Sequence, residues 1–356
     1  MTTIEIKELT INDADFWDTL VERSPQGTLF HKYSFLITVA KYSKSKLHCF
    51  AGYLGNEIIA AIPFFYEKKH FRRKFLSPVN SAFIQNLGPI FPDYDILKQD
   101  KKEFYFREFQ KELDDYIERE FNIRNIFIIT SPFLIDARPF VWNNYKITPQ
   151  YNYIKNIKNL DAVWKDLKKQ LRKNIEKADK SGIIIHEGNF NDLQKITKSI
   201  SSRLEEQNII LKTSNEYLNE LFQFFYPKNL KIFVAEYQGE FVSGIVVIAY
   251  KNKISIWIGA TQTDLKGLYP VDLLQWKIID WGHANGYEYC EIFGANMPTI
   301  SYFKSRYNFD LDIYWSVKKE KHFVDLAGIE EQLKFLRAKI FKRLLISKKD
   351  NESIHE

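Results

Sequence analysis

The chain has 356 residues, of which 45% are hydrophobic and 27% are charged, and this balance excludes an intrinsically disordered, collagen-like or disulfide-rich protein. Its 51 Lys and Arg against 45 Asp and Glu give a net charge of +6, which permits anionic partners without requiring them. At roughly 150 residues per domain, the length predicts two domains.

The two cysteines, Cys49 and Cys290, are too few for a disulfide framework or a cysteine-rich zinc site, so we expect reduced, buried thiols and a cytosolic location. The first residues lack the charged and then apolar build of a signal peptide. No run of about 18 apolar residues occurs, so no membrane-spanning helix is predicted. We therefore expect a cytoplasmic protein.

In chain order, the first half is expected to contain helices at 13–23 and 33–40, a strand hairpin, a helix at 102–121 and a strand at 126–130. The hairpin is predicted where two apolar stretches flank a Gly55-Asn56 turn, because this dipeptide favours the tight turns that join antiparallel strands.

The hairpin occurs twice in the sequence. With one single-residue gap, the stretch from Phe233 repeats it and places Glu240 over Glu57. The offset, 240 minus 57, is 183 residues, close to half of the chain, so two similar tandem domains explain both the repeat and the length. The alternative is a chance similarity of two hairpins. We place the first domain at 1–148 and the second at 149–320.

After the first domain the sequence predicts a strand at 151–157 and then one long helix from residue 161 to Gly182. Trp164, Leu171 and Ala178 are among the apolar residues that recur at helical spacing beneath a basic outer face. Gly182 is expected to end this helix.

The repeated hairpin is followed by a third strand at 254–261, a helix that starts after Pro270 and ends at Gly286, and a strand at 287–294. Three strands, a helix and a strand differ from the strict alternation of a doubly wound nucleotide-binding fold. We therefore predict an α+β fold, with a mostly antiparallel mixed sheet flanked by helices in each domain.

Several short stretches, taken in order, are similar to positions of one enzyme family. They are Phe30-His31, Ser77-Pro78, the basic stretch from Arg172 to Ala178 with Gly182, the segment 259–281, and Tyr302-Phe303-Lys304 with Phe309. From about residue 30 to about residue 317 the chain resembles the Fem-type branch of the GNAT acyltransferases. The resemblance implies two tandem GNAT-like domains and an enzyme that transfers an acyl or aminoacyl group.

The resemblance also bears on the acyl donor. In ordinary GNAT acetyltransferases a Gly-rich turn at a helix N-terminus holds the pyrophosphate of acetyl-CoA. The corresponding stretch here, 264–270, keeps only Gly267, while Tyr269 adds bulk and Pro270 lacks an N–H donor. The same loss is expected of the Fem-type branch, whose donor is an aminoacyl-tRNA. The resemblance therefore implies no bound cofactor and an aminoacyl-tRNA co-substrate; the alternative is acyl-CoA held by another loop.

Acyl transfer to an amine needs a neutral amine, a well-placed carbonyl and a donor for the oxyanion, but no covalent nucleophile. The chain contains no GxSxG, HExxH or CxxC pattern, so we predict neither a serine nucleophile nor a metal site. By the resemblance, Lys304 lies where donor and acceptor meet, and its ammonium would stabilise the oxyanion or bind a tRNA phosphate. Glu291 would accept the amine's proton or orient a loop. These two residues are the catalytic candidates.

Seven further residues are candidates for substrate binding, as groups that would hold the acyl donor or contact phosphates: Phe303, Tyr302, Tyr269, Gly267, Lys41, Arg172 and Asn296. The resemblance places Lys41 near an acceptor diphosphate. The alternative interpretations are a surface lysine beside a core phenylalanine for Lys304, and a solvated basic helix face for Arg172.

The last segment, 321–356, predicts an amphipathic helix that carries no acid between Leu333 and Lys349. It would bind tRNA or an anionic membrane at its inner face, or pack back on the first domain.

Taken together, we expect an acyltransferase that moves an aminoacyl or acyl group onto an amine of a cell-envelope, peptidoglycan-like precursor. Two alternatives stand beside it. One is an acyl-CoA-dependent N-acyltransferase acting on an amino sugar or surface-polysaccharide precursor, and the other is a noncatalytic tRNA- or membrane-binding module. The sequence leaves the oligomeric state open.

Overall fold

A computed structural model describes residues 3–320 with the exception of 70–71, 80–81, 207–214, 262–264 and 266. The predicted C-terminal helix at 321–356 therefore lies outside the described residues. Within the described part of the chain, no helix is both long and apolar enough to cross a membrane.

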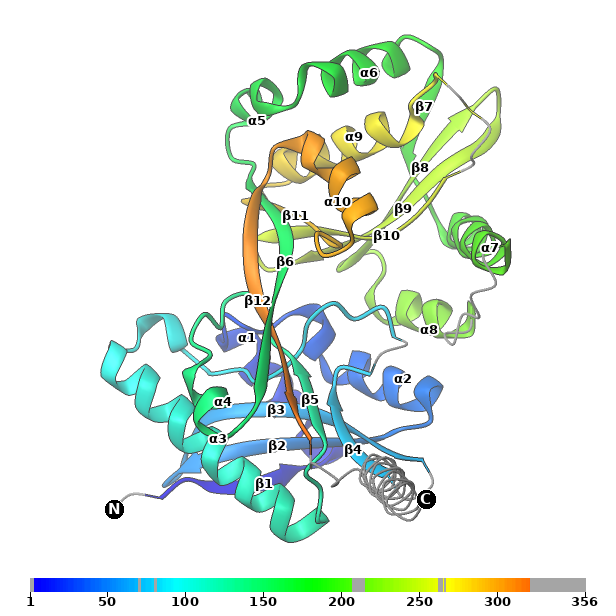
Figure 1. Ribbon diagram of the computed structural model, residues 1–356. Helices are drawn as coiled ribbons and strands as arrows, with labels where there is room; N and C mark the ends of the chain where they lie inside the picture. Colours follow the sequence, from blue (N-terminus) through cyan, green and yellow to red (C-terminus); the bar gives the residue numbers. More distant parts are fainter. Residues whose placement is uncertain are drawn as a thin grey trace, which may run out of the picture. The chain divides into compact units, whose positions relative to one another are not determined.

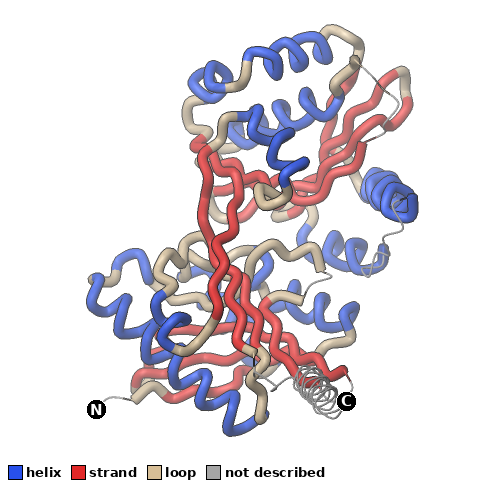
Figure 2. The backbone as a smooth tube through the Cα atoms, viewed as in Figure 1, coloured by secondary structure: helices blue, strands red, loops and turns tan. Residues whose placement is uncertain are grey.

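A single twelve-stranded sheet runs through the described residues (Figures 1 and 2). Its spatial order is β1-β2-β3-β4-β5-β12-β6-β11-β10-β9-β8-β7. In chain order the strands are β1 (Glu5–Leu9), β2 (Lys46–Leu54), β3 (Glu57–Lys69), β4 (Arg72–Ser77), β5 (Ile126–Ile129), β6 (Lys146–Asn156), β7 (Ile183–Glu187), β8 (Leu230–Tyr237), β9 (Glu240–Tyr250), β10 (Lys253–Thr261), β11 (Tyr289–Ile292) and β12 (Asp310–Lys319).

The helices cover both faces of this sheet (Figure 1). They are α1 (Ala14–Arg23), α2 (Tyr33–Ser43), α3 (Gln99–Phe121), α4 (Arg138–Trp142), α5 (Leu160–Asp166), α6 (Lys169–Asp179), α7 (Phe190–Glu206), α8 (Asn215–Phe225), α9 (Pro270–Ala284) and α10 (Pro298–Lys304), with 3-10 turns at Ile11–Asp13, Leu29–His31, Tyr94–Ile96 and Ser305–Tyr307.

The strand order is that of a tandem repeat. In each half, four strands pair antiparallel in sequence, a helix crosses over, and a fifth strand pairs parallel to the fourth: β1 to β5 around α3, and β7 to β11 around α9. The two predicted hairpins are β2–β3 and β8–β9, whose turns contain Gly55 and Gly239 at positive φ. The predicted fold class, an α+β fold of two tandem GNAT-like units, is confirmed.

The sixth strand of each half is exchanged between the halves. β6, which ends the first half, pairs with β11 of the second, and β12, which ends the second, pairs with β5 of the first. The two exchanged strands also pair with each other over nine residue pairs, from Asp310–Ile154 to Lys318–Lys146. The boundary that we predict after residue 148 falls inside β6. The division into two domains remains a prediction.

The predicted helix from residue 161 to Gly182 is wrong in one respect, because it is two helices. α5 ends at Asp166 and α6 starts at Lys169. Between them the backbone is extended, with ψ of 142° at Leu167 and 136° at Lys168. The Lys168 N–H donates to the carbonyl of Arg306 at 3.0 Å instead of continuing the helix. A contact distant in sequence therefore breaks the helix.

One hydrophobic core is shared by the two halves. It contains Trp17 and Phe35 from α1 and α2, Leu221 from α8, and Trp257 from β10. Trp257 interrupts the regular pairing of β10 with β9, and its indole N–H donates to the Phe83 carbonyl at 2.7 Å. Because these side chains come from both halves, the halves are fixed to each other by packing as well as by strand exchange.

The end of β12 is held on the first half by a buried polar cluster. The Tyr145 hydroxyl donates to Asp114 Oδ1 at 2.6 Å, and Lys319 Nζ donates to Asp114 Oδ2 at 2.9 Å. Gln110 Nε2 also donates to Asp114, at 3.0 Å. Because Asp114 is almost fully buried, each donor offsets part of the penalty for removing its charge from water.

Tyr145→Phe removes one of these donors and leaves the rest of the ring in place. We expect it to lower the free energy of unfolding by about 1–3 kcal/mol, as is usual for a hydrogen bond to a buried charge. Chemical denaturation measures this change. Tyr116→Phe is the control, because the pKa of the Tyr116 hydroxyl is affected only by burial and by charges at a distance. Equal losses of stability in the two variants would contradict the role of the Tyr145 hydrogen bond.

Candidate active site

Each half contains a pair of parallel strands that part at their C-terminal ends. In the first half the β4–β5 pairing runs from Phe75–Ile126 to Ser77–Ile128. In the second half the β10–β11 pairing stops at Ile256–Ile292, while β10 continues to Thr261 against β9 alone. Beyond these pairs the two strands are no longer hydrogen-bonded to each other, and we call this break in the pairing the gap.

In the first half the chain itself fills this gap. Leu87 forms a parallel bridge with Thr130, and its N–H donates to the Ile129 carbonyl at 2.8 Å. The next residue, Gly88, has φ of 80°, and a Cβ there would lie 3.1 Å from the Thr130 Cα. Only glycine fits this position without strain, and the gap between β4 and β5 is closed.

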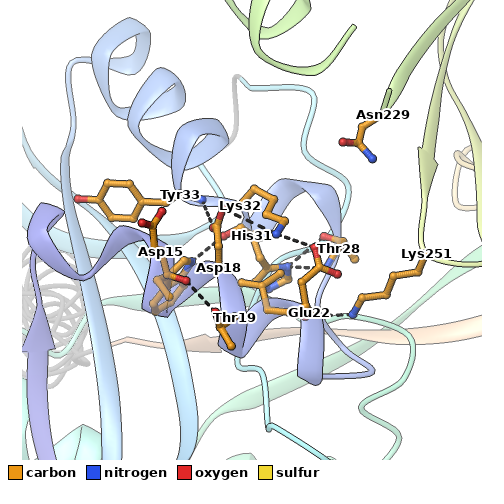
Figure 3. Close-up of polar contacts among 12 residues, drawn as sticks. Asp15, Asp18, Thr19, Glu22, Thr28, His31, Lys32, Tyr33, Asn229 and Lys251 are labelled. Atoms are coloured by element: carbon orange, nitrogen blue, oxygen red, sulfur yellow. Dashed lines mark hydrogen bonds and ion pairs between the residues drawn. The ribbon is translucent and has the colours of Figure 1, made fainter. Parts of the chain in front are cut away.

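His31 and Ser77 hold this closing segment in place. The Gly88 N–H donates to Ser77 Oγ at 3.1 Å, and His31 Nε2 lies 3.3 Å from the Gly88 carbonyl. The other ring nitrogen of His31 accepts from the Thr28 N–H at 3.2 Å (Figure 3), so Nε2 is the nitrogen that carries the proton. Complete burial lowers the pKa of His31 to about 3. His31 and Ser77, both noted from the sequence, thus have a structural explanation.

In the second half the gap is bordered by α10, which carries Lys304. The Lys304 ammonium donates to the carbonyl of Phe293, the residue that follows β11. Burial lowers the pKa of Lys304 to about 8, so most molecules carry the charge at pH 7. Among the described residues, no carboxylate forms an ion pair with it. It is a desolvated cation beside the parted strands, as an oxyanion site requires.

Four of the predicted substrate-binding residues lie together beside the start of α9. They line a cavity of about 470 Å³: Gly267, Tyr269, Tyr302 and Phe303. Both loop residues have positive φ, 84° at Gly267 and 56° at Tyr269, and Tyr302 is 81% exposed. We call this space the α9 cavity.

A carboxylate of the chain occupies the first turn of α9. Asp272 is buried and accepts two hydrogen bonds from the guanidinium of Arg306, at 2.8 and 3.1 Å. Asn174 Nδ2 donates to the same carboxylate at 2.9 Å. Pro270 has no N–H to offer, so the first turn of α9 has one donor fewer for an anion, and it already holds the ion pair of Asp272 with Arg306.

A second, larger cavity of about 630 Å³ lies where the two halves meet, and we call it the central cavity. Its walls come from the loop before α2, the loop after β5, the β9–β10 turn, β11 and β12; the residues include Thr28, Phe30, Phe133, Ile135, Lys253, Ser255, Glu291, Phe293 and Asp312. The catalytic candidate Glu291 is 1% exposed and forms an ion pair of 2.8 Å with Lys253.

Lys304 is adjacent to one lining residue of each cavity. It lines neither cavity itself, but Phe303, beside it in sequence, lines the α9 cavity, and Phe293, whose carbonyl it contacts, lines the central cavity. Lys304 thus lies close to both cavities without lining either.

The other three predicted residues lie elsewhere. Lys41, within α2 because this helix continues to Ser43, pairs with Glu220 of α8. Arg172 donates to the Lys165 carbonyl at 3.0 Å. Asn296 bonds the backbone of Tyr151 through both amide atoms. The structure places none of these three among the residues lining the two cavities.

Sequence reasoning did not identify Asp272, Arg306 or Asp312 as site residues. An acid in the first turn of a helix is commonplace, so Asp272 gave no signal. Asp312 gives no signal in the sequence either, because its position in the cavity depends on the exchange of β12 between the halves.

Comparisons with known proteins agree with this geometry. Residues 165–305 match the family model of an acetyltransferase (GNAT) domain. A search of curated protein sequences finds no match. Among solved structures, FemX superposes with a TM-score of 0.65 at 11% identity, covering 87% of this chain and 96% of FemX.

Two other solved structures share the fold. One is the C-terminal domain of a protein described as a lysylphosphatidylglycerol synthetase from Agrobacterium fabrum, with a TM-score of 0.56 at 10% identity, covering 90% of this chain and 96% of that domain. The other is a tandem GNAT protein from the clavulanic acid biosynthesis pathway, with a TM-score of 0.50 at 9% identity, covering 89% and 98%.

The class of protein follows: residues 165–305 form a GNAT domain, and the protein is an acyltransferase. Within that class, its fold is that of the Fem-like branch with two tandem GNAT units. The acyl donor of such an enzyme is a co-substrate rather than a bound cofactor. Within the described residues, no group of three His, Cys, Asp or Glu side chains is arranged to hold a metal ion.

The lowered pKa of Lys304 predicts how stability depends on pH. Below pH 8 both folded and unfolded chains hold the proton, whereas between pH 8 and 10.5 the folded chain releases it first. The unfolded state then binds more protons, so stability rises with pH across this window. Relative to Lys304→Met, the wild-type protein should gain about 2 kcal/mol between pH 7.5 and 9.5. Denaturant titrations at both pH values test this, with exposed Lys180→Met as the control; a constant difference would contradict the buried ammonium.

Proposed function

We propose that the protein transfers an aminoacyl or acyl group to an amine of a cell-envelope, peptidoglycan-like precursor. The observation that carries the proposal is the Lys304 ammonium, desolvated and without a carboxylate partner in the described chain, beside the parted ends of β10 and β11. The first half, whose gap is filled by Leu87, would support the chemistry without performing it.

In the proposed reaction the acyl ester approaches through the α9 cavity and places its carbonyl carbon near Lys304. The amine nitrogen attacks that carbon, a C–N bond forms, and the carbonyl oxygen becomes an oxyanion that the ammonium stabilises. The C–O bond to the donor then breaks, and the leaving hydroxyl takes up a proton. Proximity and charge stabilisation supply the rate, with no covalent enzyme intermediate.

The start of α9 favours an aminoacyl-tRNA as donor over acyl-CoA. A pyrophosphate would face Pro270, which has no N–H, and a carboxylate, Asp272, that already occupies the guanidinium of Arg306. The aromatic side chains of Tyr269 and Tyr302 in the α9 cavity are instead suited to stack on a nucleobase, as single-stranded RNA contacts often do.

The relatives support the envelope as the place of action. One fold neighbour is named for lysylphosphatidylglycerol, a lipid that carries an aminoacyl group. By analogy of fold, we place the acceptor among envelope components.

Lys304→Ala tests the proposed chemistry. Loss of one oxyanion donor typically lowers kcat by about 100- to 1,000-fold, and we expect this loss with little change in the binding of donor. The measurement is transfer of a labelled aminoacyl group from tRNA to a peptidoglycan precursor. Lys180→Ala, which removes an exposed lysine at the end of α6, is the matched control. An unchanged kcat in Lys304→Ala would overturn the role of this residue.

Thermal-shift measurements separate the donors. A ligand at about 100 times its dissociation constant stabilises the folded state by roughly 2.7 kcal/mol. We expect stabilisation by aminoacyl-tRNA and by a nucleotide-linked peptidoglycan precursor, and none by acetyl-CoA. Stabilisation by acetyl-CoA alone would instead favour an acyl-CoA-dependent N-acyltransferase.

A further inference from the structure

A row of polar side chains crosses the sheet at the wall of the central cavity. The register pairs Ser255 of β10 with Glu291 of β11, and Asp312 of β12 with Asn152 of β6. Glu291 in turn pairs with Ile154, two residues from Asn152 on the same face of β6. Because paired residues point to the same face and alternate residues share it, this polar row faces one space.

Glu291 has three donors within the row. Its carboxylate accepts from Ser255 Oγ at 2.8 Å and from Lys253 Nζ at 2.8 Å on Oε2, and from Asn152 Nδ2 at 3.1 Å on Oε1. The pair with Lys253 neutralises its charge. Glu291 therefore has little capacity left for a ligand, and this places its structural role ahead of a catalytic one.

The second lysine of the cavity is also occupied. Lys251 extends from the β9–β10 turn to the C-terminal end of α1 (Figure 3). There its ammonium donates to the carbonyls of Val21 at 3.0 Å and Ser24 at 2.6 Å. A cation at this end of a helix is stabilised by the carbonyl dipoles. Both lysines of the cavity wall are thus engaged, and neither is free to bind a phosphate.

The groups with acceptor capacity left are Asp312 and two buried amide oxygens. Asp312 is half-buried, and its carboxylate has a hydrogen bond to the Ile313 backbone but none to a described side chain; burial, more than the nearby carboxylate of Glu291, raises its pKa above the usual range, although Lys253 and the Ile313 bond act in the opposite direction. Asn152 Oδ1 and Asn86 Oδ1 are buried without a donor, and Asn86, 1% exposed, lines the cavity. Since Asn152 must direct its NH₂ at the Glu291 carboxylate, its oxygen is the free atom.

The remaining wall is apolar. Phe30, Phe293 and Ile154 line the cavity from within, and Phe133 and Ile135, which are 53% and 71% exposed, lie at its rim. Exposed apolar side chains beside a cavity are typical of a binding surface. The wall therefore offers hydrogen-bond acceptors to one part of a ligand and an apolar surface to the rest.

We propose that the central cavity is the acceptor site, that Asp312 binds the acceptor's ammonium group, and that an apolar part of the acceptor packs on Phe30, Phe293 and the rim formed by Phe133 and Ile135. This inference rests on the proposed function and specifies which part of the acceptor enters this cavity: its primary amine and the apolar stem that carries the amine, bound by a carboxylate and apolar side chains rather than by lysines on a phosphate. Lys41, the residue expected to read a diphosphate, is paired with Glu220 outside this cavity.

Asp312 then has a chemical task as well. The bound ammonium transfers one proton to the Asp312 carboxylate, which becomes a neutral carboxylic acid, and leaves an amine with a free electron pair. That pair forms the C–N bond with the acyl carbon, while the ester C–O bond breaks. The second proton lost by the nitrogen goes to the leaving hydroxyl, so charges and protons balance.

The test is the binding of a simple pair of probes to the full-length protein without any donor: n-hexylamine, charged at pH 7.5, and its neutral isostere 1-hexanol. Isothermal titration or ligand-observed NMR gives both affinities. We expect the wild-type protein to bind the ammonium at least about tenfold more tightly than the alcohol, because it alone provides a charge-assisted hydrogen bond to a carboxylate. Equal affinities would overturn the proposal.

Asp312→Asn keeps the shape of the side chain and removes its charge. The preference for hexylamine should fall to less than about threefold, while the affinity for hexanol stays the same. Asp310→Asn, an exposed carboxylate two residues earlier on β12 that does not line the cavity, should keep the full preference. A preference retained in Asp312→Asn would overturn the assignment, and so would an equal loss in both variants.

This assay separates the inference from the proposed function. Lys304→Ala should keep the hexylamine preference while losing transfer activity. If transfer occurs but the wild-type protein shows no preference for the amine, the acceptor site proposed here is wrong and the acyl transfer stands. If the preference depends on Asp312 and no donor supports transfer, the cavity is an amine site and the proposed reaction is wrong.

Discussion

The exchange of β6 and β12 is the constraint on which the rest of the structure depends. Each half of the sheet is completed by the last strand of the other half. The two crossing strands form the centre of one continuous sheet and carry Asn152 and Asp312 into a common wall. Because backbone hydrogen bonds span the junction, the halves cannot separate without losing strand pairing in both. The central cavity is therefore built into the fold.

The duplicated architecture has produced two different results at equivalent places. The parted strands of the first half are closed by Leu87 and Gly88, held by His31 and Ser77. Those of the second half are left bordered by Lys304, a cation without a carboxylate partner in the described chain. The first closure uses neutral groups and backbone pairing, which stabilise a fold, whereas a desolvated cation is unfavourable until an anion forms beside it. We therefore assign a structural role to the parted strands of the first half and the chemistry to those of the second half.

Local signals allowed much of the fold to be predicted from the sequence. The turns at Gly55 and Gly239 mark the two hairpins, and Pro270 and Gly286 bracket α9. The repeat of the first hairpin implied the tandem arrangement. These features depend on backbone preferences within a few residues, which a single sequence expresses directly.

What the sequence could not show depends on contacts distant in the chain. The break between α5 and α6 arises where the Lys168 N–H donates to the Arg306 carbonyl, and no residue near the break predicts it. The strand exchange is equally hidden, because the apolar pattern of β6 suits either partner. For the site, the Tyr302-Phe303-Lys304 motif led to the α9 cavity, but Asp312 is visible only once its strand is placed.

The strand exchange also determines the order in which the strands of the sheet can pair during synthesis. The outer edge of β5 finds its native neighbour only when residues 310–319 have been synthesised, and Lys319 bonds Asp114 across 205 positions of sequence. Until then the first half has an unpaired strand edge, a surface that invites wrong pairing. β6, which emerges soon after β5, is the nearest strand able to cover it. We expect β6 to pair with β5 in the growing chain and β12 to replace β6 at the edge of β5 when synthesis ends.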